Sequence, residues 1–192
     1  MTSYDAVLLA GGRASRLGAV DKPALRVGGV ALLDRVLAAV QTAGRRIVVG
    51  PVSHPTSADV VTREDPPGSG PVAAIAAGLN HVDAALVAIL AADLPFLTAS
   101  VVDSLLAAMV SGTDVAVLVD DTGRDQLLIA TWRIEALRTR LAAIGHPAGQ
   151  PVRRLVDTVA VARVRVELSI GQPPPWLDCD TGGDLRRARE WT

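Results

Sequence analysis

Apolar and polar positions divide this chain of 192 residues into alternating strand-like and helix-like segments. Apolar runs rich in β-branched residues are typical of buried strands, and they predict strands over residues 5–10, 46–50, 59–62, 85–91 and 114–119. Helical patterns lie between these runs, over residues 31–43, 71–81 and 98–111. Such alternation predicts a mostly parallel sheet that helices cover on both faces.

The starts of two of these helices carry signals of their own. Pro71 suits a first helical position, and Thr98 is expected to be an N-cap. The last third is less regular, and we expect a strand over residues 125–131, helices over 134–144 and 152–156, a strand or hairpin over 159–168, and a final helix from about residue 182. Neither a repeat nor a linker divides the chain, so residues 1–192 are expected to form one domain.

Composition and charge argue against two classes of binding partner, nucleic acids and membranes. The formal net charge of −1 argues against a general nucleic-acid binder, which is usually basic. The single cysteine, Cys179, permits no intrachain disulfide, and the first residues lack the basic region of a signal peptide. Apolar runs all fall short of the ~20 residues that a membrane helix needs. We therefore expect a cytoplasmic protein that engages neither nucleic acid nor membrane.

A glycine-rich loop after the first strand holds the only lysine of the chain, Lys22. In an open α/β sheet, ligands bind outside the carboxyl ends of the strands, where this loop is expected. Gly11 and Gly12 permit close approach of a ligand, Arg13 and Arg16 suit phosphate oxygens, and Lys22 supplies a compact charge. The loop matches neither a Walker A motif nor the dinucleotide fingerprint. A glycine turn with solvated arginines is the alternative interpretation.

Acidic residues follow other predicted strands. Asp93 ends the apolar run of residues 84–92, where a carboxylate suits Mg²⁺, which prefers one or two carboxylates plus phosphate oxygens. Its alternative role is to cap the turn before the next proline. Asp65 follows a short strand and is able to accept two donors from the Watson–Crick edge of guanine, or else is a simple loop charge. Asp178 or Asp180, late in the chain, is a candidate second metal ligand.

Together these residues resemble the molybdenum cofactor guanylyltransferases, a MobA-like group of NTP transferases. The resemblance covers nearly the whole chain in order, through residues 9–22, 70–75, 92–97, 123–127 and 178–185. It implies a Rossmann-like nucleotidyltransferase fold of the glycosyltransferase-A-like type, with three layers, α/β/α. The first motif is highly specific and the last is weak. Gly50 and Ala74 stand where the family often has Asn and Gly, and Asp178 and Asp180 replace two typical Asn.

The resemblance also implies an activity. GMP would pass from GTP to the phosphate of molybdopterin with release of pyrophosphate, and Mg²⁺ would be required. Lys22 and Arg16 would be catalytic, and Asp93 and Asp180 would hold the metal. The implied nucleotide-binding set is Leu9, Ala10, Gly11, Gly12, Arg13, Lys22, Asp65, Gly70 and Asp93. The first three would contact base and ribose through their backbone, and Asp65 would read guanine.

Two alternatives remain open. A cytidylyltransferase or a sugar-phosphate nucleotidyltransferase shares the glycine-rich loop, the lysine and the aspartate, although Gly11-Gly12 and Asp21-Lys22 favour the guanylyl branch. A nucleotide-binding protein without turnover is the second alternative, and the presence of Lys22 and Asp93 argues against it. Transient contacts with proteins that make or accept the molybdenum cofactor are also expected.

Overall fold

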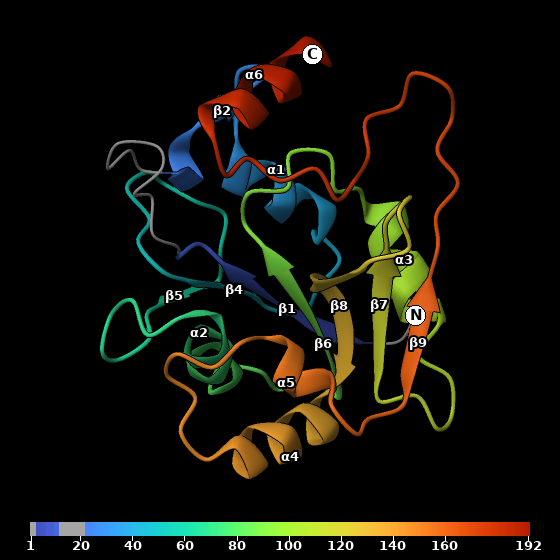
Figure 1. Cartoon of the computed structure of the whole chain (residues 1–192). Coiled ribbons are helices and arrows are strands. Elements are labelled where there is room, and N and C mark those ends of the chain that lie inside the picture. The colour runs from blue at the N-terminus through green and yellow to red at the C-terminus, as the bar shows by residue number, and fades with distance from the viewer. Residues whose placement is uncertain (1–2, 12–21) are drawn as a thin grey trace.

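A seven-stranded sheet forms the centre of the computed structural model, which describes residues 3–11 and 22–192 (Figure 1). In spatial order its strands are β5 (Val60–Thr62), β4 (Arg46–Val49), β1 (Tyr4–Leu9), β6 (Leu86–Ala91), β8 (Asp125–Arg133), β7 (Val115–Val119) and β9 (Val161–Val164). Only β8 runs antiparallel to its neighbours. The expected mostly parallel sheet is therefore confirmed.

Helices cover both faces of the sheet, as its apolar strands require (Figure 1). On one face lie α1 (Leu32–Ala39) and α3 (Ala99–Ala107), and on the other lie α2 (Pro71–Leu79), α4 (Ile134–Ile144) and α5 (Arg153–Val156). Each face has its own buried apolar cluster, because alternate residues of a strand point to opposite sides. The three-layer fold is confirmed. None of the helices in the described part of the chain has the length and apolar character needed to cross a membrane.

A third, smaller apolar cluster ties the end of the chain to its beginning. It joins the hairpin of β2 (Arg26–Val27) and β3 (Val30–Ala31) to α6 (Gly182–Glu190), with Cys179 fully buried among them. A 3₁₀-helix, η2 (Lys22–Ala24), precedes the hairpin. This packing brings the segment before α6 alongside the segment that begins at Lys22, although the two are far apart in sequence.

Cys179 has a packing role in this cluster. Burial, followed by the negative charge of Asp93, raises the pKa of its thiol to about 12. Because the thiolate is the reactive form of cysteine, the side chain is inert at neutral pH. Asp184 is equally structural, since it forms a capping box with Thr181 at the start of α6.

Several boundaries differ from the sequence prediction. The helix predicted over residues 31–43 ends at Ala39, and the hairpin of β2 and β3 was missed because its two-residue strands are too short to show a period. Thr98 occupies the N-cap position of α3, but its side chain makes no capping bond. Its hydroxyl instead lies 2.9 Å from that of Ser100, so only the position was predicted correctly.

Close packing of α2 on the sheet gives a stability prediction. A Cβ atom on Gly78 would lie 2.5 Å from Cγ1 of Val7 and 3.0 Å from Cγ2 of Val49. Gly78→Ala gains helix propensity of ~1 kcal/mol, but overpacking costs about 1–3 kcal/mol, so we expect net destabilisation of about 1 kcal/mol in urea unfolding. The cost should shrink or reverse in a Val7→Ala background, where the opposing methyl groups are absent. Equal costs in both backgrounds would contradict the steric explanation.

Candidate active site

The candidate site lies at the carboxyl ends of β1 and β6, which are neighbouring parallel strands. Leu9 pairs with Ala91, and the N–H of Ala92 donates a 3.1 Å hydrogen bond to the carbonyl of Leu9. The loops that leave these two strands therefore begin side by side, and they carry Gly11 and Asp93. A shallow groove at this point is lined by Leu9, Ala10, Gly11, Lys22, Pro23, Ala92 and Asp93.

Lys22 joins two carboxylates that come from distant parts of the chain. Its ammonium donates to Oδ2 of Asp93 and, over 2.5 Å, to Oδ1 of Asp180. Desolvation works to lower the pKa of Lys22, but the charges and hydrogen bonds of Asp93 and Asp180 outweigh it, so the pKa is raised. The ammonium therefore stays protonated at neutral pH. The structure thus assembles three residues that the sequence analysis had singled out separately.

The same carboxylates fit a hard divalent cation. Oδ1 of Asp93 is buried and has no hydrogen-bond partner among the described residues, so it retains an acceptor for a further ligand. Across residues 3–11 and 22–192, no group of three or more candidate metal ligands occurs. Magnesium suits such a sparse set, because it takes one or two carboxylates and completes its coordination with phosphate oxygens and water. Asp93 and Asp180 therefore fit Mg²⁺ held jointly with a nucleotide.

Asp178 and Asp180 differ in their contacts. Asp180 touches Lys22, whereas Asp178 forms no hydrogen bond with it. Desolvation, followed by the negative charges of Asp180 and Asp93, raises the pKa of Asp178. Asp178 is thus close enough for the charges of the site to change its pKa, while Asp180 is the carboxylate that contacts the ammonium of Lys22.

Gly50 is required where β4 ends against the glycine-rich loop. Its φ is +132°, and a Cβ atom there would lie 2.5 Å from the backbone nitrogen of Gly11 and 2.8 Å from the carbonyl carbon of Ala10. Backbone cannot yield as a flexible side chain does, so a larger residue would displace the loop. The departure from the family pattern at this position therefore has a steric reason in this chain.

The loop of residues 64–69 holds one predicted residue and one that was missed. Asp65 is exposed, while its neighbour Glu64 is only 7% exposed. Oε1 of Glu64 accepts a 2.8 Å hydrogen bond from the N–H of Gly68, and Oε2 has no partner within the described part of the chain. Glu64 also lies beside Gly11. A carboxylate two residues after a short strand was the only local signal for Glu64, and the sequence gives no measure of its burial.

The remaining predicted residues divide into two groups. Gly70 precedes α2 with φ of +94°, a conformation that glycine adopts readily, and Pro71 occupies the first turn as predicted. Gly12, Arg13 and Arg16 lie outside the described residues. Their roles stay predictions.

Asp120, at the carboxyl end of β7, gives a prediction about pH. Hydrogen bonds from the Thr122 hydroxyl and the Arg124 N–H, followed by the amide of Gln126, lower its pKa from 3.8 to about 2. A lowered pKa contributes stability above pH 3.8 that disappears as the pH falls through about 2. Urea unfolding should therefore show Asp120→Asn less stable than the parent at pH 6, with the difference shrinking towards pH 2. A constant difference would mean that the carboxylate charge is not responsible.

Comparisons with known proteins agree with this geometry. The family model described as "MobA-like NTP transferase domain" matches residues 6–164. A molybdenum cofactor guanylyltransferase of Sinorhizobium fredii is 30% identical, over 97% of this chain and 90% of that protein. Its counterpart in a Bradyrhizobium species is 32% identical, over 97% and 92%.

Solved structures share the fold along nearly the whole chain. A homologue of Mycobacterium tuberculosis rv0371c from Mycobacterium sp. strain JC1 superposes with a TM-score of 0.75 at 25% identity, over 97% of this chain and 95% of that one. The molybdopterin-guanine dinucleotide biosynthesis protein A of Archaeoglobus fulgidus gives 0.74 at 22% identity, over 97% of both. The matched segment contains both Lys22 and Asp93. The chain therefore belongs to the MobA-like NTP transferase family and is a nucleotidyltransferase.

Proposed function

We propose that this protein transfers GMP from GTP to the phosphate of molybdopterin, with Mg²⁺ as its cofactor and pyrophosphate as the second product. The observation that carries the proposal is the position of Lys22, whose ammonium contacts both Asp93 and Asp180 at the carboxyl edge of the sheet. The names of the two curated relatives described above support these substrates. The proposed setting is the cytoplasm, with transient contacts to proteins that make or accept the cofactor.

The transfer requires groups that neutralise negative charge on the phosphates, and it does not require a general base. The acceptor phosphate is already an anion, so it attacks the α-phosphorus of GTP without losing a proton, and the bond to the β-phosphate oxygen breaks. Lys22 offsets negative charge on the α-phosphate and on the departing pyrophosphate. Asp93 and Asp180 would hold Mg²⁺, which when bound supplies further positive charge to the phosphates. Arg16, in the glycine-rich loop, is proposed to assist Lys22.

Nucleotide recognition is assigned to the loops around the groove. Leu9, Ala10 and Gly11 offer backbone groups to base and ribose, at a point where Gly50 keeps the strands close. Asp65 accepts from the N1–H and the 2-amino group of guanine.

The remaining members of the proposed nucleotide site are Gly12, Arg13 and Gly70. The arginine is proposed to contact phosphate oxygens, which match the fork of a guanidinium group. Gly70 lies at the start of α2, where backbone N–H groups and the helix dipole favour an anion.

One assay separates the possible reactions. The protein is incubated with molybdopterin, Mg²⁺ and each of the four NTPs in turn, and products are identified by mass spectrometry. We expect a guanine dinucleotide and pyrophosphate from GTP alone. A product from CTP alone would instead identify a cytidylyltransferase. Saturable GTP binding without any product would show that the protein binds nucleotide without turnover.

A further inference from the structure

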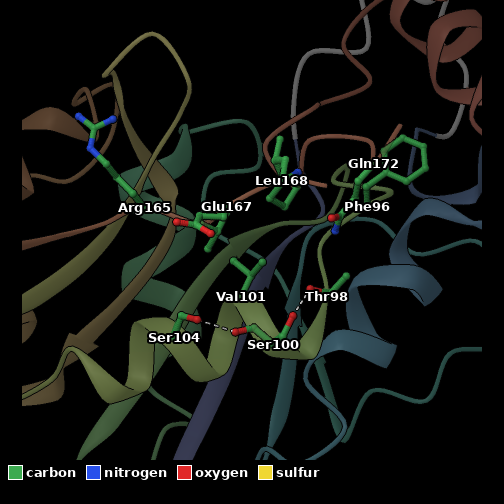
Figure 2. Close-up of a pocket in the computed structure, with 11 residues that line it drawn as sticks. Phe96, Thr98, Ser100, Val101, Ser104, Arg165, Glu167, Leu168 and Gln172 are labelled. Atoms are coloured by element: carbon green, nitrogen blue, oxygen red, sulfur yellow. Dashed lines mark hydrogen bonds between the residues drawn. The ribbon is translucent and has the colours of Figure 1, made fainter. Parts of the chain in front are cut away.

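A second cavity, of about 320 Å³, lies between the N-terminal half of α3 and the segment of residues 165–175 that follows β9 (Figure 2). This volume falls in the range of small-molecule sites, about 300–1,000 Å³. Figure 2 shows Ser100 and Ser104 of α3 on one side of the cavity and Glu167 and Leu168 on the other. The proposed nucleotide site makes no use of this space.

The linings of the cavity and of the candidate active site have no described residue in common, but two chain segments contribute to both sites. Phe96 lines the cavity and follows Asp93 by three residues, and Pro175 lines it and precedes Asp180 by five. The strands also place both sites at one edge, because β6, β7 and β9 run in the same direction. Two short stretches of chain therefore connect the cavity lining with the two carboxylates that contact Lys22.

The lining suits a neutral polar ring system and not a phosphate. Among the described residues that line the cavity, only Arg165 and Glu167 are charged, and Arg165 extends away from the α3 hydroxyls in Figure 2, towards Gly123. Glu167 forms no ion pair with another described residue. The described part of the inner walls offers no cationic side chain, and the carboxylate of Glu167 opposes a phosphate group there.

Polar groups with free hydrogen-bonding capacity accompany the apolar ones. The hydroxyls of Thr98 and Ser100 lie 2.9 Å apart, so one of them donates to the other and each oxygen keeps a further lone pair. The side-chain carbonyl of Gln172 accepts from the N–H of Ser169 over 3.2 Å, which leaves its NH₂ group without a partner among the described residues. Phe96 supplies an aromatic surface.

We propose that this cavity binds the heterocyclic ring of the acceptor, a 2-amino-4-oxopyrimidine fused to a second ring, as in a pterin. The inference rests on the proposed function and deepens it. Glu167 accepts from the 2-amino group and the neighbouring ring N–H, two donors that match a carboxylate. Phe96 and Leu168 contact the ring faces. Glu167 also repels phosphate, so the phosphate end of the acceptor points towards Lys22.

The first test fills the cavity from α3. Ser104→Phe places an aromatic ring in the space, while Asp103→Phe, one residue earlier on the exposed side of the helix, is the matched control. The probe is 6-hydroxymethylpterin, which carries no phosphate and whose fluorescence reports binding. We expect Ser104→Phe to weaken binding at least roughly tenfold, because the side chain clashes with the ligand. Asp103→Phe should bind as the parent does.

The second test addresses Glu167 without changing the shape of the cavity. Lumazine has a carbonyl where the pterin has its 2-amino group, so it presents an acceptor to the carboxylate. The parent should prefer the pterin probe over lumazine by roughly tenfold, since hydrogen bonds to a charged acceptor are strong. Glu167→Gln should narrow that preference, because an amide is able to donate as well as accept. An unchanged preference would overturn the role of Glu167.

A third measurement separates this inference from the proposed function. Binding of a non-hydrolysable GTP analogue is measured for the parent and for Ser104→Phe, and both should bind it equally. Equal pterin affinity in the parent and Ser104→Phe, or no pterin binding by the parent, would overturn the acceptor cavity while leaving nucleotide binding in place. Failure of the parent to bind the GTP analogue would contradict the proposed function itself.

Discussion

Lys22→Ala should lower the rate of guanylyl transfer by roughly 10²–10³-fold, the usual cost of removing one preorganised donor from a charged transition state. The structural reason is that Lys22 is the cation held between Asp93 and Asp180 at the carboxyl edge of the sheet. The rate is measured from pyrophosphate release at saturating GTP. Lys22→Arg is the matched control, because it keeps the charge but not the compact ammonium, and it should retain more activity than the alanine variant.

The same variant should also respond differently to Mg²⁺ without nucleotide. Removal of the ammonium leaves Asp93 and Asp180 without their shared counter-charge, and like charges repel at short range. Thermal unfolding of Lys22→Ala should therefore shift upward with added Mg²⁺ more than that of the parent. Near-parental turnover, or identical Mg²⁺ responses, would contradict the assignment of Lys22.

Asp93→Asn is expected to reduce turnover to a similar extent, roughly 10²–10³-fold. The substitution preserves shape but removes the charge that faces Lys22, and it replaces one of the two carboxylate oxygens with an NH₂ group, which does not bind a cation. An amide is a poor ligand for Mg²⁺, so the Mg²⁺ concentration needed for half-maximal activity should rise as well. Steady-state rates across a Mg²⁺ titration measure both effects.

Two further variants, measured in the same Mg²⁺ titration, test which second carboxylate holds the metal. Asp180→Asn should raise the Mg²⁺ requirement in the same direction, because Asp180 is the second carboxylate in contact with Lys22. Asp178→Asn is the matched control two residues earlier, and it should change the requirement little because Asp178 forms no hydrogen bond with Lys22. If Asp178→Asn has the larger effect, the proposed ligand pair is wrong.

Much of the fold was readable from local patterns. The strand run over residues 85–91 became β6 (Leu86–Ala91), and the helix over residues 134–144 became α4 with the same bounds. These elements were predictable because an unbroken apolar run marks a buried strand, while apolar residues at helical spacing mark a helix with one buried face. The hairpin at Arg26–Ala31 escaped notice because a pair of two-residue strands carries no period, and its stability comes from packing against α6.

The sequence by itself determined the fold class and the chemical types at the site: a glycine-rich loop that ends in a lone lysine, and an aspartate after a wholly apolar strand. These are local features, since composition and period decide them within a few residues. The tertiary structure alone decided that Asp180 reaches Lys22 while Asp178 does not, that Glu64 is buried beside Gly11, and that Phe96 and Pro175 enclose a common cavity. Those relations join distant segments through side-chain packing, which no local pattern encodes.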